Sequence, residues 1–195
     1  RNITHTDIGR FLALMLVAWS PFSGGPRLPS FLLALMGVWL LWKRRPELLG
    51  SLAVRRWVLV FALLWIPMVL SAPLSFDWQR SVVIIAVLLL YFLAGIALVH
   101  VLLSDRDRAW LTRWISIVLV VWIVDGIIQY VLGRDLLGIP LTRDGRVVGF
   151  FADNLRLSLF LAVLLPLLLK QILTGPVLWV FAAFVATSIV IVLGG

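Results

Sequence analysis

The chain has 195 residues, of which 63% are hydrophobic and 13% charged, and its mean hydropathy is +1.11. Soluble domains carry roughly 45–50% apolar and about 25% charged residues, so this composition excludes an ordinary soluble domain and indicates a membrane protein. The net charge of +8 comes from basic residues that lie between apolar runs, which points to membrane topology and membrane lipids as partners and not to nucleic acid.

Seven apolar segments follow one another along the chain, and we expect each to form a helix. They cover residues 8–22, 28–42, 57–72, 81–103, 114–132, 155–172 and 177–193. A spanning helix needs about 20 residues, so the first three segments are short for a span and the last four are long enough. The predicted fold is an all-α, polytopic transmembrane helical bundle of about seven spans. We expect residues 1–195 to be a single transmembrane domain, the N-terminal half of a longer protein.

Basic residues in the connections predict the orientation. If every segment spans, 11 of the 17 lysines and arginines fall on the side of the N-terminus and six on the other. The positive-inside rule therefore places the N-terminus in the cytoplasm. Four of the six outward basic residues lie in one connection, residues 133–156, which becomes an outward-facing, Arg-rich loop. They are Arg134, Arg143, Arg146 and Arg156.

This cluster violates the rule locally, which suggests a specific task such as binding phosphate or pyrophosphate. The planar guanidinium of arginine pairs bidentately with phosphate oxygens. The alternative is pairing with Asp135, Asp144 or Asp153, or contact with lipid headgroups. We favour that alternative for Arg134 and Arg143, each next to an aspartate, although Arg143 remains a candidate for the anion site. For Arg146 and Arg156 we favour anion binding.

Other polar residues near this loop are candidates for the same site. Asp125 and Gln129 are four residues apart and share one helix face, where Asp125 either lines a substrate funnel or pairs with a loop arginine. Asn154 or its neighbour Asp153 is expected to cap the following helix. Arg80 follows another outward turn, which either contributes to the cavity or is a simple turn.

The residue types exclude several kinds of chemistry. The chain has no cysteine, and Glu47 is its one glutamate, so a metal site is not expected and neither is a cofactor. Both histidines, His5 and His100, fall on the predicted cytoplasmic side. An outward-facing reaction would therefore need an aspartate as base, or a base from outside this chain.

The loop and its flanks resemble the O-antigen ligase and O-antigen polymerase family of bacterial inner-membrane glycosyltransferases. The motif stands as Gly145-Arg146-Val-Val-Gly149-Phe150-Phe151-Ala-Asp153-Asn154, followed by an apolar helix. Upstream, Gln129 and the run Gly133-Arg-Asp135 also fit. The resemblance covers roughly residues 60–195 and implies one half of a larger, GT-C-like membrane enzyme, whose second half supplies a further outward loop.

The resemblance implies a metal-independent glycosyltransferase on the periplasmic face of the inner membrane. Its donor would be a glycan linked to undecaprenyl pyrophosphate, and the acceptor of a ligase would be lipid A–core. Arg146 would contact the pyrophosphate or shape its pocket, and the catalytic base would lie outside this chain. Three alternatives remain open: an O-antigen polymerase, a transporter of lipid-linked glycan, and a non-catalytic membrane subunit.

Overall fold

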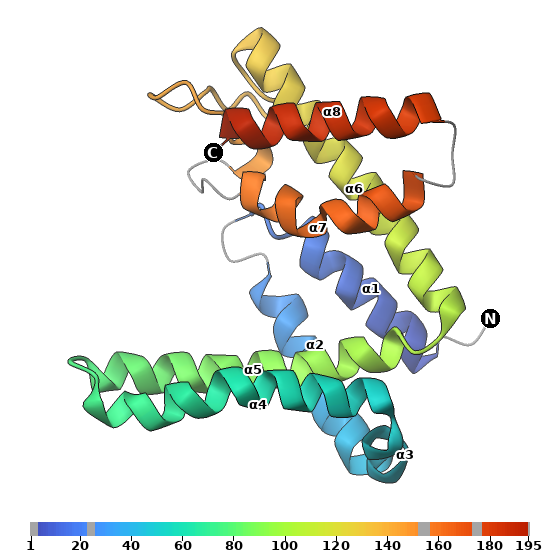
Figure 1. The fold of residues 1–195 in the computed structure, drawn as a ribbon, viewed down its shortest axis with the longest axis vertical. Coiled ribbons are helices and arrows are strands. Elements are labelled where there is room, and N and C mark those ends of the chain that lie inside the picture. Colours follow the sequence, from blue (N-terminus) through green and yellow to red (C-terminus); the bar gives the residue numbers. More distant parts are fainter. Residues whose placement is uncertain (1–3, 23–25, 152–156, 173–176, 195) are drawn as a thin grey trace. The chain divides into compact units, whose positions relative to one another are not determined.

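The computed structural model of the chain describes residues 4–22, 26–151, 157–172 and 177–194, and its regular structure in these ranges is helical. This confirms the predicted all-α class (Figure 1). The helices are α1 (His5–Ala18), α2 (Arg27–Lys43), α3 (Arg45–Gly50), α4 (Leu52–Ser71), η1 (Ala72–Leu74), α5 (Trp78–Val101), α6 (Asp105–Leu132), η2 (Gly149–Phe151), α7 (Leu157–Ile172) and α8 (Val177–Gly194). Here α marks α-helices and η marks short 3₁₀ helices.

Three helical stretches of the described chain are long and apolar enough to cross a membrane. They are Leu52–Leu74, Trp78–Val101 and Asp105–Leu132, and the shorter apolar helices are Leu157–Lys170 and Val185–Gly194. These stretches support a membrane protein, while the count of seven spans stays a prediction. The third predicted segment is longer than expected because its helix begins at Leu52 and includes Arg55 and Arg56.

The chain forms two compact units. Unit 1 contains residues 1–16 and 27–108, and unit 2 contains residues 17–26 and 109–195. No shift in composition marks this division in the sequence, because both units are built from the same kind of apolar helix.

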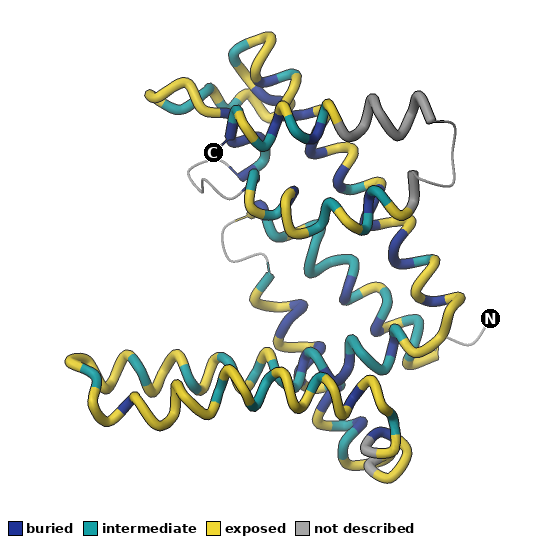
Figure 2. The backbone as a smooth tube through the Cα atoms, in the orientation of Figure 1, coloured by how far each residue is buried: buried dark blue, intermediate teal, exposed yellow. Residues whose placement is uncertain are grey.

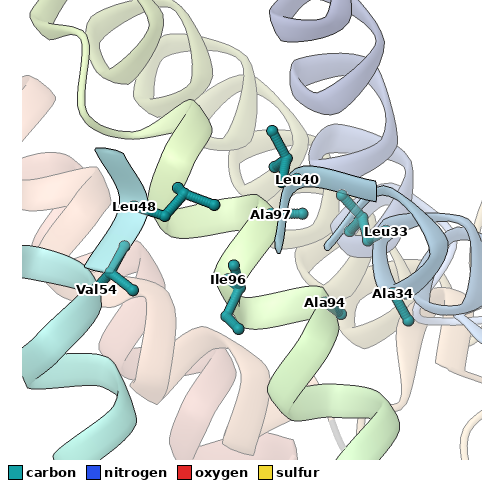
Figure 3. Packing of buried hydrophobic residues seen from close by; sticks show 8 residues of the cluster. All are labelled: Leu33, Ala34, Leu40, Leu48, Val54, Ala94, Ile96 and Ala97. Atoms are coloured by element: carbon teal, nitrogen blue, oxygen red, sulfur yellow. The ribbon is translucent and has the colours of Figure 1, made fainter. Parts of the chain in front are cut away.

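The core of unit 1 lies where α2, α3 and α4 meet α5 (Figure 3). Its buried side chains are Leu33, Ala34, Leu40, Leu48, Val54, Ala94, Ile96 and Ala97. Helices α2 and α5 come very close at Gly37, where an added Cβ would lie 2.0 Å from the carbonyl oxygen of Leu93. Small residues at such crossings let two backbones approach, which is how membrane helices gain packing contacts when lipid replaces water around them.

Helices α4 and α5 form a hairpin joined by an aromatic stripe. Trp57, Phe61 and Trp65 are spaced four residues apart and so share one face of α4. The indole Nε1 of Trp57 donates to the carbonyl of Phe92 at 3.2 Å, and the ring of Phe61 lies 4.7 Å from that of Phe92. Most other side chains of the hairpin are exposed (Figure 2), as expected of helices that face lipid.

A buried ion pair fastens α1 within unit 1. The guanidinium of Arg10 pairs with Asp107 at 2.7 Å and also with Asp7, and the side chains of Arg10 and Asp107 are only 14% and 12% exposed. Nothing in the local sequence pattern predicts this pair, because its members are 97 residues apart. Their burial makes the contact a structural one, because an isolated charge here would be costly.

Unit 2 is organised by one face of α6. Its buried positions include Ile115, Leu119 and Trp122, which recur every three to four residues. The ring of Trp122 packs edge-on against Phe151 at 5.2 Å, and Phe151 lies 5.3 Å from Phe160 of α7. The same face of α6 ends in Asp125 and Gln129, which brings two polar side chains into the interior of the unit.

Candidate functional site: an arginine-bearing loop on α6

Gln129 fastens the loop to α6 at two places along the chain. Its side chain is 0% exposed. Nε2 donates to the carbonyls of Ile139 and Pro140, each at 3.1 Å, and Oε1 accepts from the N–H groups of Val148 and Gly149, each at 2.8 Å. A primary amide offers two donors and two acceptor positions, so Gln129 uses its full capacity. Because backbone carbonyls only accept and N–H groups only donate, these partners also fix the orientation of the amide.

Asp125 holds the loop one helical turn earlier. It is 0% exposed, and its Oδ1 accepts from the N–H of Leu136 at 2.9 Å. Its Oδ2 faces Gly149, where an added Cβ would lie 2.9 Å away and where φ is +52°. A side chain at this position would be strained and would collide with the carboxylate. Within the described structure Asp125 therefore binds loop backbone, and pairs with no arginine there.

Residues 133–141, which we call the first lobe, are organised by Asp135. Its Oδ1 accepts from the N–H groups of Leu137 at 2.9 Å and Ile139 at 2.6 Å, and its side chain is buried. The lobe closes through a bridge between Arg134 and Pro140. An aspartate that binds backbone N–H groups two and four residues ahead stabilises a tight turn. The sequence predicts Asp135 as a possible partner of an arginine, whereas its observed bonds are to backbone.

Residues 142–146, the second lobe, form a tight turn that carries two arginines. The N–H of Gly145 donates to the carbonyl of Thr142 at 2.9 Å. The N–H of Arg146 donates to the hydroxyl of Thr142 at 2.9 Å, and the N–H of Thr142 donates to the carbonyl of Arg146 at 3.2 Å. These bonds hold the backbone of Arg143 and Arg146 on one small turn, on which both side chains are exposed.

The loop arginines are not neutralised within the described part of unit 2. Arg134, Arg143 and Arg146 are exposed, and none of them forms an ion pair with a described carboxylate. The predicted pairing of Arg134 and Arg143 with a neighbouring aspartate is thus not seen there. Asp135, next to Arg134, is buried and bonded to backbone, and Asp144, next to Arg143, is exposed without an ion pair among the described residues. Exposed guanidinium groups on a hydrogen-bonded frame have the charge and the donors that an anion requires, and anion binding by this loop stays a prediction.

The end of α8 accepts hydrogen bonds from the loop, at Val147, and from the first turn of α7, at Ser158. The N–H of Val147 donates to the carbonyl of Leu193 at 3.0 Å, and the hydroxyl of Ser158 donates to the carbonyl of Gly194 at 3.5 Å. The last carbonyls of a helix lack intrahelical partners, so these bonds satisfy groups that would otherwise be unpaired. The loop is therefore held by α6 on one side and by α8 on the other.

The remaining predicted site residues are placed elsewhere or lie outside the described ranges. Arg80 belongs to the first turn of α5 in unit 1, where its N–H donates to Asp77 at 3.0 Å, so it is no part of the bonded network of the loop. Asn154 and Arg156 lie outside the described residues. Across the described ranges, no three His, Asp or Glu side chains group closely enough to hold a metal ion.

Sequence reasoning missed the roles of Asp135 and Thr142. The signals were present, because Asp135 precedes Leu-Leu-Gly and Thr142 stands three residues before Gly145, both of which are turn patterns. Comparison with protein-family models, with curated proteins and with solved structures finds no match to this chain.

Proposed function

We propose that this chain is part of an inner-membrane glycosyltransferase of the O-antigen ligase type. In this proposal seven segments span the membrane in a GT-C-like arrangement, the N-terminus is cytoplasmic and the loop faces the periplasm. The enzyme moves a polysaccharide from undecaprenyl pyrophosphate to lipid A–core. Support comes from the apolar helices, from the excess of basic residues on the N-terminal side, and from the motif that begins at Gly145-Arg146.

The observation that carries the proposal is the pair Arg143 and Arg146. Both are exposed and they lie on one turn, and the buried amide of Gln129 bonds the backbone before this turn, at Ile139, and after it, at Val148. A glycan donor with a pyrophosphate leaving group gains negative charge on that group as the glycosidic bond breaks. Cations already held in place stabilise such charge without reorganising during the reaction, which is the largest contribution to catalysis in many enzymes.

In this proposal the arginines of the loop act on the donor. Asp125 and Asp135 are buried and accept hydrogen bonds from backbone N–H groups, whereas Asp144 is exposed on the turn that carries Arg143 and Arg146. The proposal places the base that takes the proton of the acceptor hydroxyl in another part of the enzyme. The loop contributes anchoring of the donor and stabilisation of its leaving group.

The test is the lipopolysaccharide profile of cells that carry Arg146→Ala or Arg143→Ala. Removing one charge-stabilising donor from an active site typically slows turnover by about 10²- to 10³-fold, so we expect lipid A–core without polymer and polymer stranded on the carrier lipid. Arg113→Ala is the matched control, because Arg113 is exposed near the other end of α6. Immunoblots must show equal amounts of all three variants.

The outcomes separate the competing functions. Lipid A–core capped by a single repeat unit would indicate a polymerase. A transporter or a binding subunit would be indicated by two results together. The wild-type protein would never release free carrier lipid, and the arginine variants would bind carrier lipid less tightly. Normal glycan transfer by Arg146→Ala at normal abundance would refute the role of this loop in donor binding.

A further inference from the structure

The first lobe folds back beside α6 instead of extending beyond it. The N–H of Leu136 bonds to Asp125, and the helix continues for seven more residues to Leu132. At a rise of 1.5 Å per residue this is about 10 Å of helix. The carbonyls of Ile139 and Pro140 bond to Gln129, which also precedes the helix end. The lobe thus lies at the level of the last two turns of α6.

The backbone N–H groups of residues 135–141 are satisfied within the protein. The N–H groups of Leu136, Leu137 and Ile139 donate to carboxylates, the first to Asp125 and the other two to Asp135. The N–H groups of Asp135, Gly138 and Leu141 donate to backbone carbonyls, which are those of Ile139, Asp135 and Gly133 in that order. Pro140 has no N–H to satisfy. Every backbone donor from residue 135 to residue 141 therefore has an acceptor. A lobe with its N–H groups paired can lie in the interfacial layer, where water still reaches the remaining carbonyls, whereas unpaired backbone is excluded from the hydrocarbon core.

The lobe also carries apolar side chains at its tip. Leu136 and Leu137 are 59% and 60% exposed, and Val131 and Leu132 at the end of α6 are 70% and 73% exposed. Arg134 lies within the same stretch and is also exposed. Apolar side chains beside an arginine suit a bilayer interface, where long basic side chains reach headgroup phosphates while leucines contact acyl chains.

We propose that the first lobe is seated in the membrane interface, with Leu136 and Leu137 among acyl chains and Arg134 on the phosphate of an anionic phospholipid. The α6 span fixes the depth, and the paired backbone lets the lobe remain there. The proposal is independent of glycan transfer, since it requires only that α6 crosses the bilayer. It places the second lobe, with Arg143 and Arg146, next to the headgroup layer.

The depth of the lobe can be measured directly because the chain contains no cysteine. The full protein with Leu137→Cys carries an environment-sensitive fluorophore and is reconstituted into phosphatidylglycerol vesicles. We expect blue-shifted emission that is quenched by acyl-chain spin labels and protected from aqueous iodide. Asp144→Cys, at the exposed turn of the second lobe, is the control and should show the reverse. Equal iodide quenching at both positions would overturn the proposal.

The headgroup is tested with the same probe. Arg134 on a lipid phosphate predicts stronger acyl-chain quenching in phosphatidylglycerol than in phosphatidylcholine, and Arg134→Gln should remove this difference. Inorganic phosphate added to the buffer should leave the quenching unchanged. Reversal of the quenching by inorganic phosphate would assign Arg134 to a soluble anion, and an unchanged lipid dependence in Arg134→Gln would remove it from the headgroup contact.

Discussion

Replacing Gln129 by leucine should release the loop from α6. Leucine has a similar volume but no polar atoms, so the substitution leaves two carbonyls and two N–H groups without their partners. Pro140 is exposed and Ile139 is partly exposed, so water can reach those carbonyls. Val148 and Gly149 are buried, so their N–H groups have no such replacement.

The size of the effect follows from these two buried donors. An unsatisfied buried polar group costs about 1–3 kcal/mol, so two of them cost about 2–6 kcal/mol. Each 1.4 kcal/mol is a factor of ten in an equilibrium. The loop should therefore open more readily, and the amides of residues 148 and 149 should exchange with deuterium about 30- to 10⁴-fold faster.

Hydrogen exchange with mass spectrometry of the reconstituted protein measures this directly. Tyr130→Leu is the matched control, because Tyr130 follows on the same helix and is 54% exposed. Exchange in the core of unit 1, for example at Ile96, should not change in either variant. Wild-type protection of residues 148 and 149 in Gln129→Leu would show that the four hydrogen bonds do not hold the loop.

Two further substitutions have matched controls within the chain. Gly149→Ala should lower the melting temperature in detergent, because a left-handed backbone costs a side chain roughly 1–2 kcal/mol and the Cβ would lie 2.9 Å from Asp125; Gly50→Ala meets nothing within 4 Å and should have little effect. Asp107→Ala removes one of the carboxylates that pair with the mostly buried Arg10 while the pair with Asp7 stays, and should cost about 1–3 kcal/mol. Asp105→Ala removes a surface pair in which Asp105 is 97% exposed and should cost at most about 1 kcal/mol. Equal melting temperatures within either pair would contradict the reasoning.

The apolar pattern predicted the long helices well, and the structure differs from it in three places. Segments 81–103 and 114–132 correspond to α5 and α6, although α6 begins earlier, at Asp105. Helix α4 also begins before its apolar segment, at Leu52 instead of residue 57. Charged residues such as Arg55 and Arg56 do not interrupt a helix, because its backbone hydrogen bonds do not depend on the side chains. The short helix α3 was not expected, since six residues around Pro46 carry too little periodicity to be recognised.

The candidate site was predicted in part. Spacing placed Asp125 and Gln129 on one face of a helix, and the excess of arginines marked the loop. Spacing could not reveal that the partners of Gln129 are backbone groups 10 to 20 residues further along the chain. Such contacts depend on how the chain returns to the helix, which local pattern does not encode.

The sequence by itself determined the class of protein and the approximate position of its long helices. The length and apolarity of a segment are local properties, and they decide whether a helix can cross the hydrocarbon layer. Only the tertiary structure decided what the polar residues do. From the sequence, the polar residues near the loop are predicted partners of arginines or of a substrate. In the structure Asp125, Gln129 and Asp135 bond to loop backbone instead. Arg143 and Arg146 are left exposed. The physical reason is that buried N–H and C=O groups must be paired, and the nearest polar side chains meet that demand first.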